Sequence, residues 1–389
     1  MTLPVLEPHD TAAAAAMLAD AAASGTRLVP HGHQTKLDPR AQTSEERGLS
    51  SLGLTSGLVH YAGDLVATIP AGCTLREANA RLAVERQWLP LDPPVSGLAT
   101  IGGIVAANAS GPRRHRYGSP RDLIIGIEVA LTNGTTAHSG GRVVKNVAGY
   151  DLARLFCGSQ GSLGLITSVT FKLAPLSPAS HTVVARFASA QNAAGCALDL
   201  ASVPSLTPSA IELVAPDARL LVRFETTRRS GEQMAAAAAA ILATECTDVE
   251  ILEDAADTAV WAAHEAQESV MTGVVASISV LPNAVGGAIE DAARIAEESG
   301  VRWAATGSAA LGVVRLRTEG EAPAQARCAA ALRAAITARG GHVQFTGQTL
   351  LLPETFDLSG TLGTARAINA AVKQRFDPDG ILPSPWSRD

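Results

Sequence analysis

The chain has 389 residues, which is enough for two or three domains and a large buried core. Its 31 basic and 37 acidic residues give a net charge of −6 at a charged fraction of 17%. These values argue against a disordered chain and against a lysine-rich nucleic-acid binder. Five widely spaced cysteines, none in a C-x-x-C pair, predict reduced thiols and neither a disulfide framework nor an iron–sulfur or zinc site.

The start of the chain carries acidic residues before an alanine run, and its longest apolar run spans about ten residues. We therefore expect no secretory signal, no membrane-spanning helix and a cytoplasmic location. The 35 glycines are the unusual feature of the composition, because glycine permits tight turns and close approach of the backbone to a ligand.

Hydrophobic periodicity in the first part of the chain predicts an α+β domain. Helices are expected over 11–23 and 75–85, and strands over 26–29, 67–70, 123–131 and 163–173. The segment APLSPAS at 174–180 marks a boundary, so we expect domains over 1–177 and 178–360. A helix over 362–376, within a final segment 361–389, ends at the stop signal Asp377-Pro378-Asp379-Gly380.

Residues 178–360 repeat one order of elements: strand, helix, strand, strand, helix, strand. The first round covers 181–252 and the second covers 272–346. This order predicts a duplicated ferredoxin-like unit with a single antiparallel sheet and helices on one face.

Several common catalytic signatures are missing from the sequence. It contains no G-x-G-x-x-G after a strand, no Walker A motif and no G-x-S-x-G elbow, which argues against a nicotinamide Rossmann domain or a P-loop enzyme. The segment from His264 to Glu268 lacks the second histidine of a zinc helix, and we interpret it as a solvated helix face.

Small residues cluster between 100 and 173 and leave backbone amides uncovered by side chains. Successive uncovered N–H groups can bind a pyrophosphate or the carbonyl edge of a flat heterocycle. A glycine-rich sheet corner without a ligand would produce the same clusters, so each cluster alone leaves both readings open.

Several motifs in combination resemble a known flavoprotein family. They are PHGHQTK at 30–36, PAGCTL at 70–75, TIGGIVAANASG at 100–111, RYGSPRDLIIGIEVALTNG at 116–134, VVKNVAGYDLARLFCGSQGSLGLIT at 143–167 and RFDPDGIL at 375–382. The family is that of vanillyl-alcohol oxidase and p-cresol methylhydroxylase, and the chain looks most like the FAD-binding subunits of glycolate oxidase within it.

The resemblance implies a two-subdomain FAD-binding PCMH-type domain, an antiparallel-sheet cap domain and a C-terminal segment that returns to the FAD domain. It also implies that the turn after the first strand wraps the FAD pyrophosphate and that three later segments line the rest of FAD. The residues so implied are His31, Gly32, His33, Gln34, Thr35, Pro94, Thr100, Gly103, Ala107, Asn108, Ser110, Gly161, Ser162, Gly164, Leu165 and Ile166. A bulky side chain at Gly103 or Gly164 is expected to block the cofactor.

The first turn departs from the family pattern because Gly32 is its only glycine. A positive φ at His33 or Gln34 would therefore be costly. Some relatives attach flavin to a histidine near this turn, but the register of His31 and His33 differs, and we expect noncovalent FAD.

Two basic features leave alternatives open. The run from Arg113 to Arg116 predicts contact with the FAD diphosphate, contact with a partner subunit, or an exposed loop, and no nucleic-acid contact is expected from it. Lys145 either stabilises negative charge on the reduced flavin ring or is a surface lysine.

Catalytic relatives carry a histidine-rich metal motif in the second domain, where His264 and His342 of this sequence stand alone. No catalytic residue and no metal site is therefore assigned. The resemblance implies an FAD-binding subunit that works with a catalytic flavin subunit and an iron–sulfur subunit of a glycolate oxidase-type complex, which would be its only link to a membrane. A stand-alone FAD-dependent oxidoreductase and a flavin-free scaffold remain the alternatives.

Overall fold

The computed structural model describes residues 5–37, 46–142, 151–270, 272–360, 363 and 365–383, so Lys145 lies outside the described residues. The chain forms two compact units. Unit 1 comprises Met1–Gly111, Tyr117–Leu176 and Thr361–Asp389, and unit 2 comprises Pro112–Arg116 and Ser177–Gly360. The short segment Pro112–Arg116, which the sequence analysis placed in the first domain, thus groups with unit 2.

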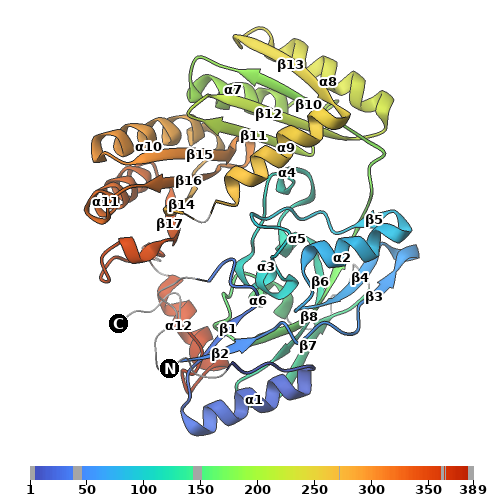
Figure 1. Cartoon of the computed structure of the whole chain (residues 1–389), viewed down its shortest axis with the longest axis vertical. Helices are drawn as coiled ribbons and strands as arrows, with labels where there is room; N and C mark the ends of the chain where they lie inside the picture. The colour runs from blue at the N-terminus through green and yellow to red at the C-terminus, as the bar shows by residue number, and fades with distance from the viewer. Residues whose placement is uncertain are drawn as a thin grey trace. The chain divides into compact units, whose positions relative to one another are not determined.

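Unit 1 is built on a five-stranded antiparallel sheet in the order β3-β4-β8-β6-β7 (Figure 1). Its strands are β3 (Val59–Tyr61), β4 (Val66–Pro70), β6 (Ile124–Ala130), β7 (Thr136–Gly140) and β8 (Leu165–Lys172). Two smaller sheets pair β1 (Leu28–His31) with β2 (Arg47–Ser50) in parallel, and β5 (Gln87–Trp88) with β9 (Ala174–Pro175) in antiparallel.

Helices complete unit 1 and bury their apolar faces in one core. They are α1 (Thr11–Ser24), α2 (Leu75–Leu82), α3 (Ile101–Ala107), α5 (Pro120–Leu123), α6 (Leu152–Phe156) and α12 (Ala365–Phe376), and α4 (Arg114–Tyr117) begins in unit 2. The core contains Leu18 of α1, Ile69 of β4, Val169 of β8 and, from the C-terminal segment, Ile381 and Leu382. Residues at both ends of the chain therefore help to bury one core.

Caps explain several helix starts. Asp10 accepts a hydrogen bond from the Ala13 N–H at 2.7 Å, and Thr74 and Glu77 form a reciprocal capping box at the start of α2. The helix predicted over 11–23 accordingly begins at Thr11 and ends one residue later than expected, at Ser24, before Gly25.

Unit 2 contains an eight-stranded antiparallel sheet in the order β13-β10-β12-β11-β15-β16-β14-β17. The strands are β10 (Ala179–Arg186), β11 (Ala210–Ala215), β12 (Arg219–Thr226), β13 (Asp248–Glu253), β14 (Val274–Ser279), β15 (Arg302–Ser308), β16 (Val313–Glu319) and β17 (His342–Gly347). Helices α7 (Ala190–Ala201), α8 (Arg228–Leu242), α10 (Val285–Ser299) and α11 (Ala322–Ala338) follow the repeated βαββαβ order. The duplicated ferredoxin-like arrangement is confirmed, and β11 and β15 join its halves.

Helix α9 (Asp254–Glu268) lies outside the repeated βαββαβ order, and the sequence analysis anticipated only its last turn, at 264–268 (Figure 1). Helices α7, α8, α10 and α11 share one core, whereas Trp261 of α9 packs with Val184, Val214 and Leu221 in a separate cluster. Side chains alternate between sheet faces along a strand, so α9 covers the opposite face. The expectation that helices occupy a single face was therefore wrong for α9.

Candidate cofactor site

The turn after β1 lies against the loop that leads into α3. A Cβ on Gly32 would lie 2.3 Å from Thr100 Oγ1, so the turn backbone approaches that side chain directly. His33 Nδ1 lies 3.0 Å from the Leu98 carbonyl oxygen, and Lys36 Nζ donates a hydrogen bond to the Pro94 carbonyl at 2.8 Å. Two segments about sixty residues apart in the sequence are thereby joined.

The glycine-rich loop before β8 lies against α3 and the end of β1. The N–H groups of Gly158 and Gln160 donate to the carbonyls of Val105 and Ala106 at 3.0 and 2.8 Å. Cys157 Sγ donates to Asn108 Oδ1 at 3.3 Å. A Cβ on Gly161 would lie 3.2 Å from Pro30 Cβ, so this loop also approaches the strand that leads into the first turn.

Backbone strain is spread over these four segments, one residue in each. Gln34, Val95, Asn108 and Gln160 have φ values of 58°, 59°, 47° and 53°, in the left-handed region that L-residues avoid. Such conformations cost about 1–3 kcal/mol each and occur preferentially at ligand-binding sites. The cost foreseen at His33 or Gln34 occurs at Gln34, and the strained residues in the other three segments were not foreseen from the sequence.

The first turn offers backbone donors for an anion. Within the described residues, the N–H groups of Gly32, His33, Gln34 and Thr35 donate no hydrogen bond. The amides at the start of α3 are already used, because Ile101, Gly102 and Gly103 donate to Cys73, Ala71 and Thr100 respectively. The turn therefore fits a pyrophosphate through its amides, whereas α3 offers no spare donors at its start.

Gly103 and Gly164 differ in why they are glycines. A Cβ on Gly103 would meet only Thr100 Oγ1, at 3.0 Å, so the space in front of it is otherwise open, as a cofactor surface requires. Gly164 has a φ of 152°, and a Cβ there would lie 2.6 Å from the Ala130 carbonyl oxygen. The sheet itself therefore already requires glycine at 164, independently of any cofactor.

The remaining predicted residues occupy the edges of this arrangement. His31 ends β1, Ala107 ends α3, and Ser110 follows in the loop. Leu165 and Ile166 pair with Ala130 and Val129 in the sheet, and their side chains are buried in the core of unit 1. Only backbone atoms of Leu165 and Ile166 are thus suited to contact a ligand.

Two lysines that the sequence analysis did not select support the site. Lys36 ties the first turn to Pro94, as described above. Lys373 of α12 donates to the carbonyls of Ser162 and Leu382, both at 2.9 Å, and forms an ion pair with the buried Asp377. Desolvation lowers the pKa of Lys373, and its bond to Asp377 opposes that shift. The motif RFDPDGIL pointed to this region, but the contact with Ser162 spans 211 positions and leaves no local pattern.

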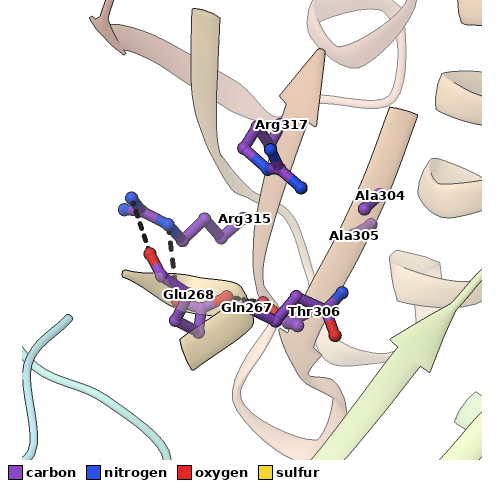
Figure 2. Close-up of a pocket in the computed structure, with 7 residues that line it drawn as sticks. All are labelled: Gln267, Glu268, Ala304, Ala305, Thr306, Arg315 and Arg317. Atoms are coloured by element: carbon purple, nitrogen blue, oxygen red, sulfur yellow. Dashed lines mark hydrogen bonds and ion pairs between the residues drawn. The ribbon is translucent and has the colours of Figure 1, made fainter. Parts of the chain in front are cut away.

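Unit 2 contains a small pocket of its own at the C-terminal end of α9 (Figure 2). Glu268 pairs with Arg315, its Oε2 lying 3.4 Å from Nε, and also accepts a hydrogen bond from Thr306. Arg317, the other arginine of the pocket, pairs with Glu319. Both arginine charges are therefore compensated by carboxylates, and a carboxylate ligand would have to compete with them.

The histidine of α9 is buried, so the solvated face inferred from the sequence was wrong. His264 is 5% exposed, and its Nε2 lies 3.8 Å from Glu212 Oε2. Burial, with a smaller contribution from the Arg219 charge, lowers the pKa of His264 to about 4, so the ring is neutral near pH 7. Among the described residues, no three His, Cys, Asp or Glu side chains are grouped to hold a metal.

The cysteines are free thiols, as expected, but only Cys73, Cys157 and Cys328 are buried. Cys196 and Cys246 are partly exposed. Burial raises the pKa of Cys157, beside Asn108, to about 12, so this thiol is an unreactive packing group.

Sequence comparison identifies related proteins. Residues 3–140 match the FAD binding domain family. The chain is 34% identical over 159 residues to the glycolate oxidase subunit GlcD of Bacillus subtilis (strain 168), covering 41% of this chain and 34% of that protein. It is 44% identical over 126 residues to the glycolate oxidase subunit GlcE of Escherichia coli (strain K12), covering 32% of this chain and 36% of that protein.

A D-lactate dehydrogenase of Archaeoglobus fulgidus is 30% identical over 211 residues, or 54% of this chain and 47% of that protein. The matched regions thus span about a third to a half of the length of these relatives.

Comparison with solved structures supports the fold. An alkyldihydroxyacetonephosphate synthase matches with a TM-score of 0.75 at 16% identity, over 97% of this chain and 76% of that chain. This likeness shows a shared architecture and nothing about the reaction. The resemblance drawn from the motifs is confirmed: residues 3–140 match the FAD binding domain family, glycolate oxidase subunits are among the relatives, and FAD is the cofactor that these matches support.

Proposed function

We propose that this protein is the FAD-binding subunit of a glycolate oxidase-type complex, in which a partner subunit oxidises a 2-hydroxy acid. The chain would stabilise that complex or relay electrons within it. The observation that carries the proposal is the set of unbonded amides at residues 32–35, next to segments that each hold one strained residue. Similarity to glycolate oxidase subunits supports the choice of complex.

FAD, when bound, supplies a two-electron acceptor. The residues of unit 1 bind and orient it: the amides of Gly32 to Thr35 hold the pyrophosphate, and the backbone near Pro94, Asn108 and Gly161 lines the remainder. Neither His31 nor His33 is expected to form a bond to the flavin, because their register differs from that of the relatives that attach flavin covalently. Noncovalent attachment predicts that acid precipitation of the holoprotein releases all flavin into the supernatant.

The histidine and arginine side chains of unit 2 agree with a companion role. Oxidation of a 2-hydroxy acid needs a base near the hydroxyl and a cation for the carboxylate. Within the described residues, His264 is buried, and the arginines of the pocket in Figure 2 are paired. The partners we propose are a catalytic flavin subunit and an iron–sulfur subunit, in the cytoplasm or at a membrane surface reached through them. No helix among the described residues is long and apolar enough to cross a membrane.

The test is to purify the chain alone, record its visible spectrum and assay glycolate oxidation with and without GlcD-type and iron–sulfur partners. We expect flavin absorbance in the chain alone and glycolate turnover only in the assembled complex. Absence of flavin from the chain, alone and assembled, would overturn cofactor binding. Glycolate turnover by the isolated chain would instead favour a stand-alone oxidoreductase.

A further inference from the structure

In the basic run from Arg113 to Arg116, the two terminal arginines are bonded to one residue of unit 2, Glu225. Arg113 donates three hydrogen bonds to the Glu225 carboxylate, from Nε at 3.2 and 3.0 Å and from Nη2 at 2.8 Å. Arg116 Nη1 donates to the Glu225 backbone carbonyl at 3.1 Å. The side chains of Arg113 and Glu225 are only 20% and 9% exposed, so this is a partly buried, two-pronged ion pair within unit 2.

Glu225 is itself fixed from the other side. Arg223 Nη1 lies 3.8 Å from Glu225 Oε1, and Arg223 Nη2 donates to Asp257 of α9 at 3.0 Å. Burial opposes ionisation of Glu225, but the hydrogen bonds and charges of Arg113 and Arg223 outweigh it and hold its pKa below the ordinary value. Charges alternate along the row Arg113, Glu225, Arg223 and Asp257, so each buried charge has an opposite neighbour.

Arg113, at one end of this row, follows the proposed cofactor segment directly in the sequence. The chain leaves unit 1 after Gly111 and re-enters it at Tyr117, so only five residues separate the two crossings. Within unit 1, a Cβ on Gly111 would clash with the Asp92 carbonyl oxygen, so the backbone passes close to that oxygen. Asn108 and Ser110, both proposed to line FAD, therefore lie just before a point where Arg113 holds the chain.

We propose that Arg113 is a positioning residue for the cofactor: its ion pair with Glu225 sets the conformation of residues 107–111 and thereby tunes FAD affinity and the flavin spectrum. This inference rests on the proposed function of these residues as part of the FAD site. Arg113 acts through the backbone and touches no flavin atom. A lysine at position 113 would keep the positive charge but could not form the two-pronged hydrogen bonds. Arg113→Lys therefore separates the effect of the charge from the effect of the hydrogen-bond geometry.

The test compares Arg113→Lys, Arg113→Gln and Glu225→Gln with Arg228→Gln, which removes an exposed ion pair with Asp254 in the same unit. FAD affinity is measured by titration of the apoprotein, together with the absorbance spectrum of the bound flavin. Amide hydrogen exchange is followed in 107–111 and, as a reference, in β17, which lies at the far edge of the same sheet. We expect FAD affinity to fall about tenfold in Arg113→Gln and Glu225→Gln, and less in Arg113→Lys.

In these variants the flavin spectrum should shift and exchange in 107–111 should accelerate, while exchange in β17 and all values of the Arg228→Gln protein should match wild type. If Arg113→Gln fails to fold, Arg113→Lys and Glu225→Gln still decide the question. Wild-type affinity, spectrum and exchange in every folded variant would overturn the positioning role while leaving FAD binding by the wild type intact. Failure of the wild type to bind FAD would overturn the proposed function itself, and this inference with it.

Discussion

Gln34 holds the left-handed conformation that glycine adopts without cost in such turns. Its side chain is exposed, so the backbone rather than a side-chain contact explains the strain. The strained φ orients the backbone N–H groups of the turn and lowers the stability of the folded state. Such local strain is common at binding sites.

Gln34→Gly is therefore expected to raise the free energy of unfolding by up to about 1 kcal/mol and to leave FAD affinity within about twofold of wild type. Arg86→Gly is the matched control, because Arg86 is also exposed, has a φ of 56° and lies outside the proposed FAD segments. Urea unfolding measures the free energy of unfolding of the two variants, and FAD titration measures their FAD affinity. A Gln34→Gly protein that is less stable than wild type would show that the glutamine side chain, not backbone strain, matters at this position.

At the scale of elements, α9 binds its sheet through polar groups along one helix face. Asp257 accepts hydrogen bonds from Thr182 and Arg223, and Trp261 donates to Thr182 at 2.7 Å. His264 faces Glu212, and Glu268 pairs with Arg315. Hydrophobic periodicity identifies apolar helix faces, so it could not predict which side of α9 is buried.

The neutral, buried His264 makes stability depend on pH. The unfolded chain protonates this histidine near pH 6.5, whereas the folded protein does so only near pH 4. Between pH 6.5 and pH 4 the unfolded state therefore binds more protons than the folded state. The contribution of His264 to the free energy of unfolding is fully present above this range and is lost as the pH falls through it. The expected contribution of His264 is a loss of about 2 kcal/mol between pH 7.5 and pH 5.

Urea unfolding of wild type and His264→Gln at both pH values measures this loss. The variant should show a smaller difference between the two pH values, while His342→Gln, at an exposed position, should behave as wild type. An equal pH dependence in His264→Gln and wild type would contradict the assignment.

Helix α12 links the last part of the chain to the cofactor site through Lys373. Lys373→Met would leave the buried Asp377 without its cationic partner, although the N–H groups of Ile381 and Leu382 would still donate to it. We expect this to cost about 3 kcal/mol of unfolding free energy and to weaken FAD binding. The double variant Lys373→Met/Asp377→Asn should regain part of the stability but not the FAD affinity, because Ser162 still lacks its donor. Thermal unfolding measures the stability of these variants, and FAD titration measures their FAD affinity. Arg375→Met, at an exposed position on the same helix, is the control. FAD affinity equal to wild type in Lys373→Met would exclude a role in the site.

At the scale of the whole molecule, local patterns predicted most elements and the repeat in unit 2. The helix over 11–23 and the stop signal after Phe376 depend on short-range patterns, so one sequence was enough to predict them. The pairing of Arg113 with Glu225 joins residues 112 positions apart, and nothing local specifies it. Of the candidate FAD segments, those between 100 and 173 contain clusters of small residues, whereas the turn at 30–36 and the segment 94–100 were selected from the family resemblance. The supporting lysines were missed because a lysine has no positional signature.

Unit 1 is discontinuous, and this has a consequence for synthesis on the ribosome. Lys373 and Asp377 are translated after all of unit 2, yet they complete the contacts of Ser162 and bury Ile381 and Leu382 in the core of unit 1. A nascent chain that has just finished unit 2 therefore exposes an unfinished cofactor site. We therefore expect flavin to bind only after translation has passed α12, and products truncated before α12 to lack flavin.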